Sequence, residues 1–489
     1  MKVFRSLLAV SLFLTPLITG CLAGAVTSAP PAGAGGEVDE ALVKAYAHFC
    51  LGVSFELNAR IPEAIEEYRT VLRYDPESLE AALKLGALLL SQEKADEAVA
   101  WLRKARDLAP DSYRARFILG TALYKANKTA EAIEEYRAAL AISPDEISPY
   151  LLIGAIYTQT DDQAGALRVY REALARQPDN PNLPFRIGLL LIKQDKLPDA
   201  IAMFKKTIEL APRLLEARLA LAVAYDLNDQ DDLSIEEYEK ALKMSPANTA
   251  IYQSLGALYY TTGQADKAAN VFSLLLKLQP NSSKAYVLLG AVQMGAKKYD
   301  QAIEAYRKAM ELGENNDLVY FQLGAAYERS GRFDQAVSQF ERSIQINPRN
   351  AEAFNYLGYM YAEKGVKLEE AIELIEKALE LEPENGAYID SLGWAYYRKG
   401  LIPEAVEKLE KAAEIISDDP VIRDHLGDAY HEQGQGDKAL EQWRKALDLE
   451  PDDPAPIEEK IKGSETPPPE EIPNSESQIP NNNQAPTDQ

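Results

Sequence analysis

Three side chains near the C-terminus have types and a spacing that could bind a metal ion. Asp424, Asp428 and His431 stand at i, i+4 and i+7, so a helix would place all three on one face. Two carboxylates and an imidazole are ordinary ligands of a divalent cation. The face offers no fourth ligand, and the alternative is a solvated helix face. We favour the solvated face, and we expect neither a metal nor a cofactor.

The rest of the chain offers little for catalysis. It has three histidines and two cysteines, no cysteine pair at metal spacing, no phosphate loop and no Gly-x-Ser-x-Gly motif. A formal charge of -24 argues against nucleic acid, because a phosphate backbone is held by Lys and Arg. Residues 369–489 hold 30 acids and 11 bases. This acidic part is either a soluble surface or a face that steers a basic partner.

Glycines recur along the chain at an interval of 34 residues, with one step of 35 and one doubled step. They occupy positions 52, 86, 120, 154, 188, 256, 290, 324, 358, 393 and 427. Ala222 fills the doubled step, since it lies 34 residues after Gly188. A fixed period of this length is typical of a solenoid built from stacked repeats. The spacing therefore predicts twelve units over about residues 45–453.

Each unit reads as two antiparallel helices. Counted from seven residues before the glycine (repeat positions 1 to 34), apolar residues recur at positions 4, 7, 8 and 11, and again at 20, 24 and 27. In the third unit these include Leu119, Leu123, Ala132 and Tyr136. Two apolar stripes at helical spacing, separated by polar turn residues, predict a helical hairpin. Small residues at positions 8 and 20 let the two backbones approach, and the large ring at position 24 fills the space.

These residues resemble the tetratricopeptide repeat family, and the resemblance covers more than four-fifths of the chain. It implies an all-α, right-handed superhelical solenoid of about twelve helix-turn-helix units over residues 38–453. A short capping helix is expected at 454–463, followed by a disordered tail at 464–489. The units begin near residues 45, 79, 113, 147, 181, 215, 249, 283, 317, 351, 386 and 420.

The first twenty residues read as a signal peptide. Lys2 and Arg5 precede an apolar run that is too short to remain as a membrane span. The run ends in Ile18-Thr19-Gly20-Cys21, which resembles a bacterial lipobox and implies acylation of Cys21. An ordinary cleaved signal with a chance cysteine is the alternative. Residues 21–37 are expected to form a flexible tether. By the same resemblance, the anchor would lie in the inner leaflet of the outer membrane, facing the periplasm. Cys50 would then be unpaired, and we expect it to be a buried small hydrophobe.

By resemblance to the family, positions 2, 5, 9 and 12 of each first helix face the concave side, where partners usually bind. Position 5 is mostly apolar through nine units and polar in the last three. These rings either bind an extended or amphipathic partner or only pack between neighbouring units. The candidate partner-binding residues are Tyr46, Phe49, Phe117, Tyr124, Phe185, Phe321, Asn355, Asp390, Trp394, Tyr397, Asp424 and Asp428.

Three classes of function fit these observations to different degrees. The first is a non-catalytic, lipid-anchored scaffold that binds proteins or peptides in assembly of an envelope or secretion machine. The second is a periplasmic chaperone-like protein that captures unfolded clients. The third is a hydrolase or transferase, which no residue set supports. We expect the scaffold, with no small-molecule substrate.

Overall fold

The computed structural model describes residues 39–465 of the 489-residue chain. Over that range it contains 25 α-helices and no strand, which confirms the predicted all-α repeat solenoid. No helix within the range is both long and apolar enough to cross a membrane. The signal peptide, the tether with Cys21 and nearly all of the C-terminal tail lie outside the described residues, so those assignments stay predictions.

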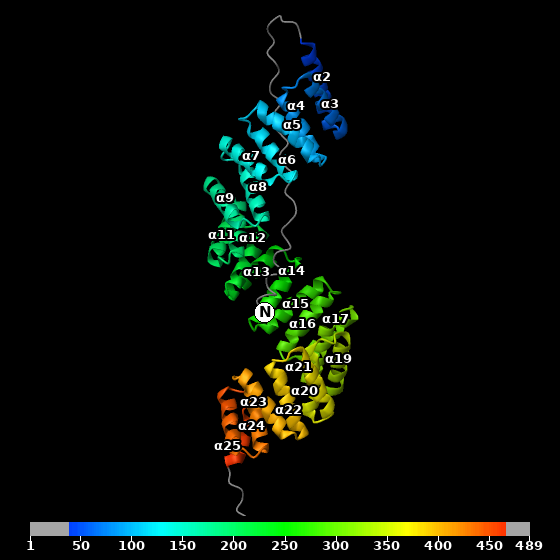
Figure 1. Ribbon diagram of the computed structural model, residues 1–489, viewed down its shortest axis with the longest axis vertical. Helices are drawn as coiled ribbons and strands as arrows, with labels where there is room; N and C mark the ends of the chain where they lie inside the picture. Colours follow the sequence, from blue (N-terminus) through cyan, green and yellow to red (C-terminus); the bar gives the residue numbers. More distant parts are fainter. Residues whose placement is uncertain (1–38, 466–489) are drawn as a thin grey trace, which may run out of the picture. The chain divides into compact units, whose positions relative to one another are not determined.

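The described residues pack as two compact units, with the division between residues 255 and 256. Even-numbered helices up to α24 are the first helices of hairpins, and the odd-numbered helix that follows each one is its partner (Figure 1). The first unit contains α2 (Glu40–Leu57), α3 (Ile61–Tyr74), α4 (Leu79–Ser91), α5 (Ala95–Leu108), α6 (Tyr113–Lys125), α7 (Thr129–Ile142), α8 (Ile147–Gln159), α9 (Gln163–Arg176), α10 (Asn182–Lys193), α11 (Leu197–Leu210), α12 (Leu215–Leu227), α13 (Asp231–Met244) and the start of α14 (Thr249–Thr261).

The second unit continues from within α14 to a final unpaired helix, α26. It contains α15 (Ala265–Leu278), α16 (Ser283–Gly295), α17 (Tyr299–Glu311), α18 (Asp317–Arg329), α19 (Phe333–Ile346), α20 (Ala351–Lys364), α21 (Leu368–Leu381), α22 (Gly386–Lys399), α23 (Ile402–Ile415), α24 (Pro420–Glu432), α25 (Gly436–Asp448) and α26 (Ala455–Glu465). α2 has 18 residues, whereas the other first helices have 12 to 14.

Position 15 of the repeat lies in the turn inside each hairpin and has a left-handed backbone in all twelve hairpins. It is glycine in five of them and Asn or Asp in four, and the short polar side chains of Asn and Asp tolerate this backbone conformation. The other three turns have Ala59, Glu93 and Lys297 there. In the tenth hairpin, Gly365 and Lys367 both have positive φ, which accommodates the one-residue insertion. The glycine, asparagine and aspartate residues at position 15 therefore reflect the left-handed backbone that the turn requires.

The closest packing in a hairpin joins the glycine at position 8 to the side chain at position 24. A Cβ atom built on Gly154 would lie 2.3 Å from Cε1 of Tyr170, and one on Gly120 would lie 2.8 Å from the ring of Tyr136. Real Cβ contacts are never this short, so no side chain fits at these positions. The position-24 rings are fully buried or nearly so, and each closes the gap between its two helices.

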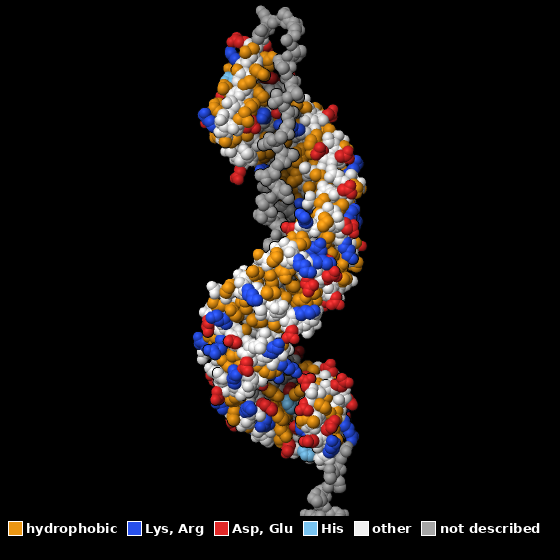
Figure 2. Space-filling model, turned by 180° about the vertical axis from the view of Figure 1, so that it is seen from behind, with side chains coloured by type: hydrophobic (Ala, Val, Ile, Leu, Met, Phe, Trp, Pro, Cys, Tyr) orange, Lys and Arg blue, Asp and Glu red, His pale blue; other side chains and the backbone are white. Residues whose placement is uncertain are grey.

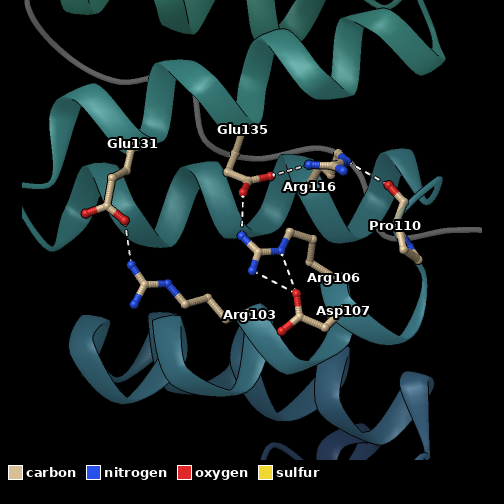
Figure 3. Close-up of polar contacts among 7 residues, drawn as sticks. All are labelled: Arg103, Arg106, Asp107, Pro110, Arg116, Glu131 and Glu135. Carbon is tan, nitrogen blue, oxygen red and sulfur yellow. Dashed lines mark hydrogen bonds and ion pairs between the residues drawn. The ribbon is translucent and has the colours of Figure 1, made fainter.

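Ion pairs on Glu135 and Glu131 of α7 connect neighbouring hairpins through α5, and one of them also joins the two helices of a single hairpin. Figure 3 shows Glu135 of α7 accepting hydrogen bonds from Arg106 of α5 and Arg116 of α6, at 2.8 Å and 3.0 Å. The Glu135 side chain is only 11% exposed, so these contacts are shielded from solvent more than a surface pair is. Arg103 makes a similar but more exposed contact with Glu131. The contacts fix how one hairpin stacks on the next.

The prediction that Cys50 is buried is wrong. Cys50 is exposed, because it stands on the side of α2 that faces away from the rest of the array. In an inner hairpin this side of the first helix is covered by the preceding hairpin, and α2 has no preceding hairpin among the described residues. The apolar pattern around Cys50 is the same as that of an inner hairpin, so the sequence pattern alone could not show that this side of α2 is exposed.

The glycine–ring contact is tested by Gly154→Ala, with Gly436→Ala as the matched control. The Gly154→Ala methyl group would collide with Tyr170, whereas a Cβ on Gly436 meets nothing within 4 Å. Overpacking of this kind costs about 1–3 kcal/mol. We expect faster amide hydrogen exchange confined to α8, α9 and their neighbours, since solenoid stability is local. The control should exchange as the parent chain does. Equal behaviour of the two variants would contradict the steric account.

Candidate binding surface

Positions 2, 5, 9 and 12 of the first helices, which are predicted to face the concave side, are called the inner surface. In the first unit its most prominent feature is a set of phenylalanines at position 5, each resting on the position-24 ring of its own hairpin. The ring centroids of Phe117 and Tyr136 are 5.8 Å apart, and those of Phe185 and Phe204 are 6.0 Å apart. Phe117 and Phe185 are nevertheless half-buried. One side of each ring is fixed by packing, and part of each ring stays accessible.

Other inner-surface residues of the first unit add to this apolar area. Phe49 packs edge-on against Tyr68 at 5.6 Å and is half-buried. Tyr46 is 66% exposed. The hydroxyl of Tyr124 donates to Oε1 of Gln159 at 2.5 Å, so this ring is tied to the next first helix, α8. All five aromatic residues predicted for this half of the chain therefore keep accessible surface.

The first helices between those that carry the phenylalanines have a small residue at position 9. Ala87 and Ala155, at position 9 of α4 and α8, are exposed. The position-9 residues of the helices that carry the phenylalanines are larger, and Val53, Thr121 and Leu189 are half-buried. The apolar surface of the first unit therefore alternates between rings and short side chains from one first helix to the next.

In the second unit the predicted residues are more deeply buried. Phe321 is 4% exposed, and its ring packs on Phe340 of its own hairpin and on Tyr356 of the next. The alternative that position-5 rings pack between neighbouring hairpins thus holds for Phe321. Asn355 is 8% exposed, and its Oδ1 atom lies buried with no hydrogen-bond partner among the described residues.

Asp390 and Trp394 of α22 are held by the hairpin that follows. Nδ1 of His425 lies 3.1 Å from Oδ1 of Asp390, and the His425 ring stacks on Trp394 at 4.1 Å. Nε1 of Trp394 donates to Oε2 of Glu363 at 2.9 Å. Burial lowers the pKa of His425, but the charge and hydrogen bond of Asp390 outweigh it, so the pKa is raised. Tyr397 stacks on Trp394 at 4.9 Å and remains half-buried.

The acidic pair at the end of the array is occupied by a lysine that sequence reasoning missed. Nζ of Lys460, on α26, lies 2.8 Å from Oδ1 of Asp424 and 2.8 Å from Oδ2 of Asp428. Burial raises the pKa of Asp428, and Lys460 opposes this shift. The rings of His431 and Trp443 are 5.5 Å apart. No group of three or more His, Cys, Asp or Glu residues within 39–465 is arranged to hold a metal ion.

The repeat pattern continues into α26 and could have predicted the contact that Lys460 makes with the preceding hairpin. Ile457 is buried and Ile461 packs on the same core, with the four-residue spacing that positions 3 and 7 have in a first helix. α26 therefore follows the pattern of the first helix of a thirteenth, incomplete repeat. Lys460 then takes the repeat position of His425, and both side chains reach position 5 of the preceding hairpin.

Charge is distributed unevenly over the surface of the array. Acidic side chains are frequent on the final helices in the view of Figure 2. Several of the inner-surface carboxylates have partners within the chain, as described for Asp390, Asp424 and Asp428. The apolar inner surface of the first unit is therefore the larger accessible part of the predicted site.

Comparison with protein families gives matches over much of the chain. The profile described as the cilia and flagella-associated protein 70 C-terminal domain matches residues 196–461, more than half of the chain. Profiles described as tetratricopeptide repeats match residues 51–113 and 147–180, and one described as TPR repeat matches 120–161. No curated protein matches the chain.

Solved structures with similar folds include three kinds of protein. The APC/C hetero-tetramer Cut9-Hcn1 has 16% identity over 87% of this chain and 97% of that one, with a TM-score of 0.43. Yeast Tom70 has 18% identity over 86% of this chain and 95% of that one, with a TM-score of 0.40. MamA has 31% identity over 35% of this chain and 92% of that one, with a TM-score of 0.32.

The role of Lys460 is tested by Lys460→Met, with Lys462→Met as the matched control. Lys460→Met leaves Asp424 and Asp428 of α24 without their shared cation, whereas Lys462 is 74% exposed. We expect loss of hydrogen-exchange protection in α26 for Lys460→Met only, because removing one partner of a buried ion pair leaves the other uncompensated. Unchanged protection of α26 would show that Ile457 and its apolar contacts hold the helix alone.

Proposed function

The chain belongs to the tetratricopeptide repeat family, and we propose that it is a non-catalytic scaffold that binds protein or peptide partners. The observation that carries this proposal is the inner surface of residues 39–255. There Phe117 and Phe185 are fixed against a buried ring and remain partly accessible. Fixed aromatic side chains lose little conformational entropy when a partner binds, which favours affinity.

The chemistry of this surface favours an apolar stretch of polypeptide as the partner. Phenylalanines separated by exposed small residues offer a row of shallow contacts, and such a row suits an amphipathic helix or an extended segment. Position 2 of the same helices carries exposed polar side chains, among them Arg114, Ser148 and Asn182, so the partner's recognition would combine the spacing of its apolar side chains with polar contacts beside them. A partner that needs a basic side chain in the acidic end must compete with Lys460.

Capture of unfolded clients is the second candidate. The same apolar row supports it, because an unfolded chain exposes apolar side chains at irregular spacing. The two functions differ in what they bind. A scaffold binds a folded or specific segment once, whereas a capture protein binds many denatured chains with similar affinity.

We also propose that the chain is anchored by a lipid in the bacterial cell envelope, in an assembly or secretion machine. This rests on the sequence Ile18-Thr19-Gly20-Cys21, which resembles a lipobox, and on the charge-free segment that follows it. An acylated Cys21 would hold the repeat array at the membrane surface through residues 22–38. The family membership is compatible with this placement and does not itself establish it.

Partner binding is tested by Phe117→Ala and Phe185→Ala, with Ile142→Ala as the matched control. Ile142 is 37% exposed on α7, a second helix of the same hairpin as Phe117. We expect the two phenylalanine variants to lose photo-crosslinked partners in the envelope by about tenfold, which corresponds to about 1.4 kcal/mol. Helicity by circular dichroism should stay unchanged. Equal partner recovery in all variants would remove the inner surface as the binding site.

Lipid anchoring is tested by Cys21→Ser, with Cys50→Ser as the matched control. The sequence contains two cysteines, so the pair of variants separates the lipid site from a general effect of removing a thiol. We expect metabolic labelling with a palmitate analogue, and recovery in the membrane fraction, to be lost for Cys21→Ser only. Labelling that persists in Cys21→Ser would contradict the lipobox assignment while leaving the scaffold proposal intact.

A further inference from the structure

The array ends differently at its two termini. At the C-terminal end, α26 covers α25, and Ile457 is 4% exposed while Glu458, Glu459 and Lys462 face solvent. This is the polar outer face that a terminal repeat needs for solubility. At the N-terminal end, α2 has no such cover among the described residues. The apolar face that α2 presents therefore needs an explanation.

Exposed apolar side chains are concentrated on α2. Five of the exposed large hydrophobic residues lie on this helix, and no other described helix carries more than two. They are Leu42, Val43, Tyr46, Leu51 and Leu57, with exposed fractions of 57%, 52%, 66%, 46% and 82%. In Figure 2 apolar side chains are prominent over the N-terminal end of the described residues. Single exposed hydrophobic residues are ordinary, but a cluster on one helix marks an interaction surface.

Part of this cluster is the stripe that other first helices use to pack on the preceding hairpin. Position 7 is Leu or Ile in all twelve hairpins. It is buried in ten of the inner hairpins and half-buried at Leu289, yet it is 46% exposed at Leu51. Position 3 is alanine in six hairpins, and it is exposed only at Ala47. We call Val43, Ala47, Cys50, Leu51 and Ser54 the end face.

The end face therefore has the residue types of the interface by which first helices pack on the preceding hairpin elsewhere in the described residues. We propose that two copies of the chain pair through the end faces of their α2 helices. A two-fold arrangement would bring the same residues together from both copies. Ala47, Cys50 and Ser54 are small, so the two helix backbones can approach closely along the middle of the face, while Val43 and Leu51 provide apolar area.

Charge favours a second copy at this place. Residues 45–55 contain no Asp, Glu, Lys or Arg, whereas the chain as a whole carries a net charge of -24. Two copies of an acidic chain repel one another where their acidic parts approach, and residues 369–489 hold 30 acids against 11 bases. The end face is a place where they can meet without bringing like charges together.

Two other occupants fit less well. An anionic membrane surface attracts helices with Lys and Arg along their polar side, but the only cation on α2 is Lys44, which pairs with Glu40 at 2.7 Å. Residues 22–36 precede α2 closely, but their sequence has Leu22 and Val26 as its only large aliphatic residues. A helix-packing stripe cannot be made from so few apolar side chains.

The test uses the full-length chain carrying Cys21→Ser, so that Cys50 is its only thiol. Sedimentation equilibrium should show a dimer, and Val43→Glu with Ala47→Glu should lower the association constant at least about tenfold. Val421→Glu is the matched control, because Val421 is 50% exposed on α24, and it should leave the dimer unchanged. A short bis-maleimide should link Cys50 to Cys50 in the control but not in the Val43/Ala47 double variant.

Several results would overturn the proposal. One such result is that the chain sediments as a monomer at all concentrations. Another is that the Val43/Ala47 double variant still sediments as a dimer and that Cys50 does not crosslink to Cys50 in the control. Flotation with vesicles of phosphatidylglycerol and phosphatidylethanolamine provides the third arm. A monomer that binds these vesicles, and loses that binding in the double variant, would assign the end face to a lipid surface instead. Circular dichroism of each variant checks that its helices remain folded.

Discussion

The contact between the glycine at position 8 and the large side chain that it faces on the second helix sets the geometry of eleven of the twelve hairpins, and Ala222 takes the place of the glycine in the sixth. At Gly154 there is no space for even one methyl group beside Tyr170, so the two helices are as close as their backbones and one ring allow. That ring also supports the phenylalanine at position 5 in four hairpins, at 5.5 to 6.0 Å between centroids. The side chain that closes the hairpin is thus the one that positions the inner surface.

The two parts of the inner surface use this support differently. In residues 39–255 the position-5 rings are half-buried, so part of each ring stays accessible. Toward the C-terminus, Asn355, Asp390 and Trp394 are buried, and Asp424 and Asp428 share Lys460. The acidic end is consequently a set of contacts that joins hairpins, and the apolar part is the surface available to a partner.

Most of the fold could be predicted from the sequence because the residues that specify a helical hairpin recur in each of the twelve repeats. Period, small residues, large rings and turn residues all agree on a helical hairpin, and agreement across levels is what makes a fold predictable. Which of the predicted site residues are accessible was harder to predict than the fold. Asp390 looked like an accessible carboxylate because its partner, His425, lies 35 residues away. Cys50 looked buried because the local pattern at α2 matches that of an inner hairpin, and only the missing neighbour exposes it. Lys460 was missed because α26 is an incomplete repeat without a glycine to mark it.

One buried ring, Tyr136, closes the third hairpin and also supports Phe117 at position 5. A double-mutant cycle on Phe117→Leu and Tyr136→Leu, read from the local hydrogen-exchange free energies of α6, measures this coupling directly. Aromatic pairs in contact are coupled by about 0.5–1.5 kcal/mol, and we expect a value in that range. Strictly additive effects of the two substitutions would contradict it.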